Sequence, residues 1–348
     1  MPNTIEQRYP GIAKHLPRIE LCERPTPVEV NEIVIDGARI SVAVKRDDLT
    51  SPIYGGNKVR KLEYLLHRAK DRGASRVATF GAIASNHATA TSIFSQREGF
   101  ECTCFLSHQT RTPAAGRALH MHRQLGTRLV EYGGSRQKRI ETLRQALPGQ
   151  KTWVVPLGGT CWLGVVGVVD AGLELAAQIE NGELPQPADL YVAMGTMGTV
   201  AGIAIGLALA ELPTRVHAVR VTDEWVASPV ILRQLVHKTA TLLHRMDTRI
   251  PADLADRVNI SYRPEFFGPG YARLTPESER AVAIADEQLG LKLENTYTGK
   301  AFAALLADGR SDVQTMFWNT YNSTPLPVDT LRPDDVSGIP EAFLSYFD

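Results

Sequence analysis

Two glycines stand directly before a cluster of cations in the segment GGNKVRKLE, residues 55–63. Paired glycines let a backbone approach a ligand closely, and Lys58 and Lys61 share a face if the segment is helical. Cations are unfavourable at the start of a helix, where the dipole is positive, so their presence indicates that an anion compensates them. A lysine crowded by cations has a lowered pKa and becomes a usable amine nucleophile. Lys58 is therefore a candidate nucleophile, and a solvated basic helix end is the alternative.

A second polar turn, Ser85-Asn86-His87, follows a strand-like segment at residues 76–80. Ser and Asn are common helix N-caps, and capping is the default explanation of this turn. Ligands of open α/β sheets bind at the carboxyl ends of strands, so the same position also lets Asn86 present its amide to a ligand.

A third turn, GTMGT at residues 195–199, lies between a strand-like and a helix-like segment. Such a turn offers free N–H groups and the positive end of a helix dipole, so it predicts a phosphate site. It matches neither GxGxxG nor GxxxxGK[ST], which excludes a dinucleotide fingerprint and a P-loop.

Strand-like and helix-compatible segments alternate along the chain around these turns. The predicted strands are residues 76–80, 101–106, 128–132, 152–157, 190–194 and 215–221, and the predicted helices are residues 87–99, 114–125, 136–147, 200–212 and 277–290. Alternation of this kind predicts an α/β fold with parallel sheets and right-handed crossovers. The chain has 348 residues, which suits two α/β units, one of them inserted in the other.

Charge and cysteine usage narrow the function classes. Lys plus Arg and Asp plus Glu both number 38, so no basic excess indicates a nucleic acid or an anionic membrane as partner. The four cysteines form no CxxC pair, which favours reduced thiols in the cytoplasm. Cys102 and Cys104 with nearby histidines resemble a metal cluster only loosely, and we expect buried strand cysteines and no metal.

A run of 21 residues without charge, residues 190–210, is a membrane-span candidate by length. Its flanks, Asp189 and Glu211, are acidic where basic anchors are expected. Its first residues read as a strand and GTMGT as a turn, so we expect strand, turn and helix and no membrane partner.

Taken together, the motifs resemble one family of enzymes. KRDDLTSPIYGGNKVRKLEY, SNHA, the GTMGT turn, GPGY and YTGKA follow one another in this order. They resemble the pyridoxal-phosphate enzymes of the 1-aminocyclopropane-1-carboxylate deaminase and D-cysteine desulfhydrase family. The resemblance runs from about residue 16 to 328.

The resemblance implies a tryptophan-synthase-β-like fold (fold type II): two open, twisted, mostly parallel sheets with helices on both faces, the smaller domain inserted into the larger. It places the large, cofactor-binding domain at residues 1–60 plus 171–348 and the small domain at residues 61–170. It also implies a homodimer and pyridoxal 5'-phosphate as the cofactor.

The resemblance assigns roles residue by residue. Lys58 matches the Schiff-base lysine, and Ser85, Tyr271 and Tyr297 complete the predicted catalytic set. The predicted cofactor contacts are Lys58, Lys61, Asn86, Gly195, Thr196, Met197, Gly198, Thr199 and Thr320. The predicted substrate contacts are Ser85, Asn86, His87, Tyr321 and Asn322.

The chain departs from the family pattern at several of these positions. Thr298 stands where the deaminases have an acid that serves the pyridine nitrogen, which moves the sequence toward the desulfhydrases and assigns that contact to Thr320. Tyr321 and Asn322 replace two glycines, and Met197 replaces a glycine of the phosphate turn. If Tyr321 and Asn322 point into the pocket, we expect weak activity on D-cysteine and better activity on an amino acid with a further polar or anionic group. The alternative is a shifted loop whose side chains face the protein.

The predicted function is α,β-elimination on a small amino acid with a sulfur or similar leaving group at Cβ, giving a 2-oxo acid and ammonia. The alternatives are a cyclopropane amino-acid deaminase and a specialised family member with a polar amino-acid substrate. A nucleotide-dependent oxidoreductase would need the absent GxGxxG motif. A cofactor-holding protein with a degenerate site is disfavoured by the intact motif residues.

Overall fold

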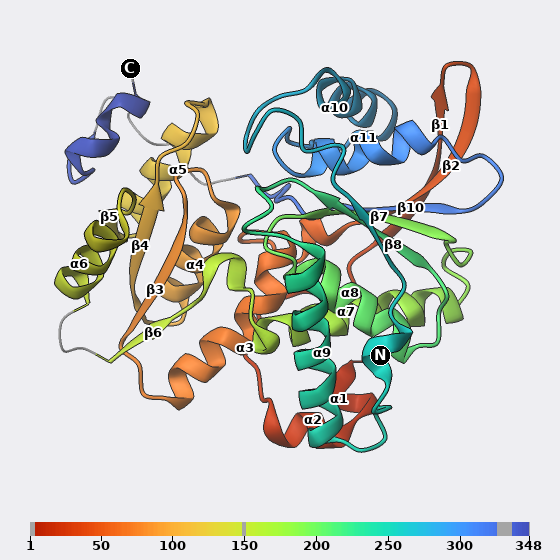
Figure 1. The fold of residues 1–348 in the computed structure, drawn as a ribbon, viewed down its shortest axis with the longest axis horizontal. Coiled ribbons are helices and arrows are strands. Elements are labelled where there is room, and N and C mark those ends of the chain that lie inside the picture. The colour runs from red at the N-terminus through yellow and green to blue at the C-terminus, as the bar shows by residue number, and fades with distance from the viewer. Residues whose placement is uncertain (1–3, 148–150, 326–335, 348) are drawn as a thin grey trace.

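The computed structural model describes residues 4–147, 151–325 and 336–347, which form two sheets lying side by side (Figure 1). The larger sheet has the strand order β1-β2-β10-β7-β8-β9. Its strands are β1 Val28–Ile35, β2 Ala38–Lys45, β10 Thr315–Trp318, β7 Asp189–Met194, β8 Arg215–Arg220 and β9 Ile260–Arg263. β1 and β2 form an antiparallel hairpin, whereas β2, β10, β7, β8 and β9 pair in parallel.

The smaller sheet has the order β5-β4-β3-β6, and all of its pairings are parallel. Its strands are β5 Arg128–Glu131, β4 Glu101–Ser107, β3 Arg76–Ala82 and β6 Thr152–Val154. The connecting helices are α4 Asn86–Arg97, α5 Pro113–Gln124 and α6 Arg136–Ala146. Parallel strands must be joined by crossover connections, and here these connections are helices, as the alternating sequence pattern predicts.

Helices cover both faces of the larger sheet (Figure 1). The helices α3 Asn57–Asp71, α7 Trp162–Glu180, α8 Gly198–Leu209 and α9 Pro229–Met246 contribute to one buried apolar cluster, and α10 Pro276–Leu289 and α11 Thr298–Asp308 contribute to another. Short elements complete the described chain: α1 Ile5–Arg8, α2 Pro10–His15, η1 Asp47–Leu49, η2 Leu157–Gly159, η3 Leu254–Arg257 and η4 Glu341–Tyr346.

The structure confirms the predicted strands and helices to within a few residues. It adds elements that were not predicted, among them the β1–β2 hairpin and helices α7, α9 and α11. The hairpin carries a usable signal, because Asp36-Gly37 joins two alternating segments. The division at residues 60 and 170 stays a prediction.

The uncharged run at residues 190–210 forms β7, a turn and α8, and both β7 and α8 are buried in the core. Its glycines at GxxxG spacing bring α8 close to α7: a Cβ on Gly172 of α7 would lie 2.9 Å from the Cα of Gly206. Within the described residues, α7 is long and apolar enough to cross a membrane by length and composition alone, and 83% of its apolar window is buried inside the protein. Close helix packing therefore explains the small-residue pattern.

Candidate active site

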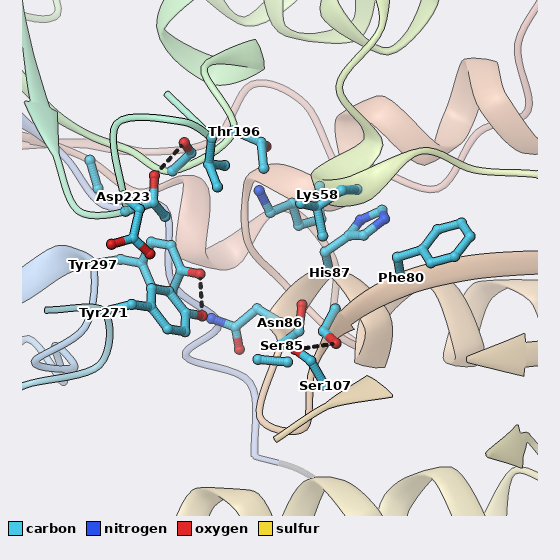
Figure 2. A pocket seen from close by; sticks show the side chains of 18 of the residues that line it. Lys58, Phe80, Ser85, Asn86, His87, Ser107, Thr196, Asp223, Tyr271 and Tyr297 are labelled. Atoms are coloured by element: carbon cyan, nitrogen blue, oxygen red, sulfur yellow. Dashed lines mark hydrogen bonds between the residues drawn. The ribbon is translucent and has the colours of Figure 1, made fainter. Parts of the chain in front are cut away.

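A cavity of about 600 Å³ opens where the carboxyl ends of β3, β4 and β5 face those of β7, β8 and β10 (Figure 2). All of the predicted site residues line it except Lys61, Gly198 and Asn322. The three turns singled out in the sequence thus meet at one place, as expected for ligand sites in open α/β sheets.

The first turn presents Lys58 on the opening turn of α3. Gly56 has φ +98, and a Cβ there would lie 3.0 Å from the carbonyl oxygen of Thr320, so this close approach requires glycine. Burial lowers the pKa of the Lys58 amine to about 8. The predicted cause, crowding by two cations, is corrected: desolvation is responsible, because Arg60 turns away into a separate ion-pair network.

Lys61 lies directly behind the cavity lining and is fully buried. Its Nζ donates to the carbonyl oxygen of Gly158 at 3.2 Å, which is the hydrogen bond that it makes among the described residues. Burial and then the neighbouring Lys58 charge hold the pKa of Lys61 well below its usual range. A Cβ on Gly198 would come within 2.7 Å of this Nζ, so the glycine leaves the space in front of the amine open. A buried cation without an anion, facing an open space, fits a phosphate group.

The GTMGT turn adds backbone donors beside Lys61. Met197 is the N-cap of α8 and has φ +67, a left-handed conformation that is costly for a non-glycine residue. No side chain of the described residues caps α8; the Gly198 N–H donates to the Thr196 carbonyl at 2.9 Å, whereas the N–H groups of Thr199 and Val200 have no partner among the described residues and are free for an anion. Asn57 Nδ2 donates to Thr199 Oγ1 at 2.7 Å and joins this turn to the start of α3.

The Ser85-Asn86-His87 turn forms the opposite wall. Ser85 is the N-cap of α4, and its Oγ accepts from the Ala88 N–H, so the capping interpretation is confirmed. Asn86 nevertheless also lines the cavity. Its Oδ1 accepts from the hydroxyl of the buried Tyr54 at 3.0 Å, which leaves the amide N–H₂ as the group available to a ligand. Tyr54 was not predicted from the sequence.

His87 is neutral in this wall. Burial, followed by the charges of Lys58 and Lys61, holds the pKa of its imidazole well below the usual range. Its Nε2 lies 2.9 Å from Thr79 Oγ1, whereas its Nδ1 has no hydrogen-bond partner among the described residues. A neutral ring can orient a bound molecule through a hydrogen bond without adding charge.

A pair of tyrosines faces the Asn86 wall (Figure 2). The hydroxyls of Tyr271 and Tyr297 are 2.7 Å apart, and burial raises the pKa of both phenols, so both stay protonated at neutral pH. A Cβ on Gly195 would lie 3.0 Å from the Tyr297 ring, which explains the glycine at the start of the GTMGT turn.

Glu294, which the sequence analysis missed, holds the loop that carries Tyr297. Its carboxylate accepts from the N–H groups of Thr296, Tyr297 and Thr298 at 2.7–2.9 Å and so caps the start of α11. Burial raises the pKa of this carboxyl, although the three N–H bonds oppose that shift. Glu294 also lines the cavity. In the sequence, Glu294 is visible only as an acidic residue four positions before α11, and such a residue is usually read as an ordinary helix cap.

Thr298 and Thr320, the two threonines weighed for the contact with the pyridine nitrogen, differ in their hydrogen bonds. Thr298 Oγ1 accepts from the Glu294 N–H at 2.9 Å and lies 3.2 Å from the Glu294 carbonyl oxygen, so its hydroxyl is already engaged. The Thr320 side chain lines the cavity and makes no hydrogen bond to another described residue. Thr320 is therefore the hydroxyl that remains available to a ligand.

The side chains of Tyr321 and Asn322 have different surroundings in the structure. Tyr321 lines the cavity, and burial raises the pKa of its phenol. Asn322 Oδ1 accepts from the N–H groups of Gly55 at 2.7 Å and Thr324 at 3.1 Å, and its Nδ2 donates to the Thr324 carbonyl. The predicted direct contact of Asn322 with substrate is corrected: its amide fastens this loop to the GGNK turn, because buried backbone donors need acceptors.

Comparison with known proteins identifies the class. The family model described as "Pyridoxal-phosphate dependent enzyme" matches residues 19–314, so the chain belongs to that family. The residues around Lys61 and the GTMGT turn fit the phosphate of this cofactor on their own contacts, as described above.

Individual relatives cover nearly the whole chain. The D-cysteine desulfhydrase of Klebsiella pneumoniae is 32% identical, and the alignment spans 83% of this chain and 88% of the desulfhydrase. The nocardicin C-9' epimerase of Nocardia uniformis is 34% identical, and the alignment spans 88% of this chain and 92% of the epimerase. A solved structure of an ACC deaminase homologue is 27% identical, with a TM-score of 0.74 over 90% of this chain and 94% of that one. The predicted family, fold class, cofactor and enzyme class, a pyridoxal-phosphate-dependent lyase, are confirmed.

Proposed function

We propose that the protein eliminates a sulfur or similar leaving group from Cβ of a small amino acid, releasing a 2-oxo acid and ammonia. The observation that carries this proposal is the Lys58 amine, with its pKa lowered to about 8, on the wall of a cavity that also holds an anion cradle and a neutral tyrosine pair. An amine of this pKa is a competent proton acceptor near neutral pH.

Bound pyridoxal phosphate supplies an electron sink for the charge that develops at the substrate's α-carbon. Lys61 and the N–H groups at the start of α8 would hold its phosphate, and Thr320 would meet its ring nitrogen. Asn86, held by Tyr54, would meet its ring hydroxyl. These assignments follow the family resemblance and agree with the groups that the structure leaves available.

The chain's own groups divide the proton transfers. Lys58 Nζ, as the neutral amine, accepts the proton from the substrate's α-carbon. The protonated Tyr271–Tyr297 pair donates a proton to the departing sulfur or oxygen. The Ser85–His87 turn, at the start of α4, binds the substrate carboxylate with a neutral imidazole and free helix N–H groups.

A cyclopropane amino-acid deaminase remains the second candidate, because a solved deaminase homologue shares the fold at 27% identity. Epimerisation at the α-carbon is a third outcome, since one relative carries the name of an epimerase. It needs proton-transfer groups on both faces of the α-carbon, and Lys58 and the tyrosine pair lie on different walls of the cavity (Figure 2).

One panel separates these reactions. The holoenzyme is given both enantiomers of cysteine and of β-chloroalanine, and 1-aminocyclopropane-1-carboxylate, and 2-oxo acid, ammonia and the chirality of the remaining amino acid are measured. Release of pyruvate and ammonia from β-substituted amino acids supports the proposal. Turnover of the cyclopropane substrate alone assigns the deaminase, and loss of chirality without ammonia assigns an epimerase.

We also propose that the protein is a homodimer of the cytoplasm. The dimer comes from the family resemblance. The location is supported by the four cysteines, all of which are free thiols.

A further inference from the structure

The cavity extends well beyond the residues assigned to the cofactor and to a small amino acid. Its outer part is lined by residues of the smaller sheet, of the segments that follow its strands and of the loop after β8: Phe80, Tyr132, Arg139, Leu157 and Trp225. None of these was predicted from the sequence as a site residue. A small substrate reacting at Lys58 would leave this part of the cavity unfilled.

Aromatic side chains form a firm wall on one side of the outer cavity. Phe80, near the end of β3, stacks on Phe105 with ring centroids 5.1 Å apart. Tyr132, directly after β5, packs edge-on against both rings, at 5.2 and 5.8 Å. Each ring is held by two others, so the wall is preformed and suits a flat apolar group.

Trp225 lies at the mouth of the same cavity. Its side chain is 78% exposed, the largest exposed fraction among the exposed large hydrophobic side chains described. Leu157, which is 42% exposed, also lines the cavity. An indole left in water at the entrance of an apolar pocket gains free energy when a ligand covers it.

Arg139, on α6, is the cation of this outer part. Its guanidinium makes no ion pair with any described residue, whereas the adjacent Lys138 lies 3.7 Å from Glu131. Asp223, a carboxylate of the same cavity lining, lies beside Tyr297 and away from Phe80 (Figure 2). Arg139 is thus available to a ligand anion, for which a planar guanidinium is well suited.

We propose that this outer part binds the far end of the substrate's side chain, which consists of an aromatic or other flat apolar group that ends in a carboxylate. The proposal rests on the proposed function and names its substrate class: an amino acid whose Cβ leaving group is a thiolate, or similar group, carrying an acidic aryl substituent. In the elimination the Cβ–S bond breaks with its electron pair on sulfur, and the thiol leaves after accepting one proton.

Matched substrates test the proposal. S-(4-carboxybenzyl)cysteine and its neutral isostere S-(4-carbamoylbenzyl)cysteine, each in both enantiomers, are compared with cysteine by kcat/KM for 2-oxo acid release. We expect the carboxybenzyl compound to be favoured over the carbamoyl compound by about 10-fold, the low end for a charge-assisted hydrogen bond. Arg139→Gln should remove this preference, and Trp225→Ala should weaken both benzyl substrates by similar factors. Lys138→Gln, the adjacent cation outside the lining, is the control and should leave the preference unchanged.

A binding measurement keeps the proposal independent of turnover. 3-(4-Carboxybenzylthio)propanoate and its carbamoyl counterpart have no α-amino group and cannot react, and their affinities for the holoenzyme are measured by calorimetry. The same 10-fold preference, lost in Arg139→Gln, supports the subsite even if no elimination is observed. Equal binding of the two compounds to the wild type, or an equal effect of Lys138→Gln, would overturn it. Turnover of cysteine without turnover of either benzyl compound would also contradict it, while leaving the proposed function intact.

Discussion

Two consecutive residues near the start of α3, Arg60 and Lys61, are both buried and basic, but they have opposite surroundings. Arg60 is fully buried, and its guanidinium lies 2.7 Å from Asp47 and 2.9 Å from Glu174. Lys45 joins the same network at 2.6 Å from Glu174. Lys61, one residue after Arg60, has a carbonyl oxygen as its partner and no carboxylate within the described structure.

The pKa values follow this difference. Burial alone would lower the pKa of Arg60, but Asp47 and Glu174 raise it well above its usual range. Burial lowers the pKa of Lys61, and the Lys58 charge adds to this shift. A cation whose charge is already balanced by carboxylates is structural, whereas a buried cation that lacks an anion indicates a ligand.

Replacing the nucleophile should have the largest effect. Lys58→Ala removes the amine that accepts the substrate proton, so turnover should fall by about 10³-fold or more. Borohydride reduction of the holoenzyme followed by peptide mapping should fix the cofactor on the peptide that contains Lys58. Lys238→Ala, on the exposed side of α9, is the control. Labelling of any other lysine in the wild type contradicts the assignment.

Breaking the balanced network should cost stability. Arg60→Met leaves Asp47 buried without a cation and Glu174 with Lys45 alone, and the free energy of unfolding should fall by about 3–5 kcal/mol. The measurement is denaturant unfolding of the apoprotein. A loss below about 1 kcal/mol would show that the network is solvated or rearranges easily.

Lys61→Met is the counterpart of Arg60→Met at the lysine that we assign to the cofactor phosphate. Removing a buried charge that lacks an anion should leave the unfolding free energy of the apoprotein unchanged or higher. Loss of one charge-assisted hydrogen bond to the phosphate costs about 1.5–3 kcal/mol, so cofactor affinity should fall by about 10- to 150-fold. Equilibrium dialysis and apoprotein unfolding measure the two effects. A destabilised apoprotein with unchanged cofactor affinity would show that Lys61 stabilises the fold and does not bind the phosphate.

The pH dependence of stability should show the smallest effect. The folded pKa of Lys58 is about 8, against 10.5 for an unperturbed lysine, so between these values the unfolded chain binds a proton that the folded chain does not. The unfolding free energy of the apoprotein should therefore rise with pH, by about 1–3 kcal/mol after allowance for the partly exposed amine. Lys58→Ala should flatten this rise between pH 8 and 9.5. An identical slope in both proteins would mean that burial does not shift this lysine.

The sequence by itself determined the features that depend on local pattern. The alternation of strands and helices predicted two parallel sheets, because side-chain periodicity follows backbone geometry. The three turns, at Gly55, Ser85 and Gly195, were identified because glycine and capping residues have short-range backbone roles. The order of these turns was enough to predict the family, the cofactor and the lysine.

Tertiary structure decided which groups each side chain meets. Arg60 meets Glu174, 114 residues away, only because α3 packs against α7, and this contact, rather than the cation count, separates it from Lys61. Asn322 turns to Gly55 and leaves the cavity to Tyr321. The cavity between the wall with Phe80 and Arg139 and the loop with Trp225 forms only when the smaller sheet faces the larger one. Local periodicity holds no information on such distant pairs, because their energies arise only after the sheets assemble.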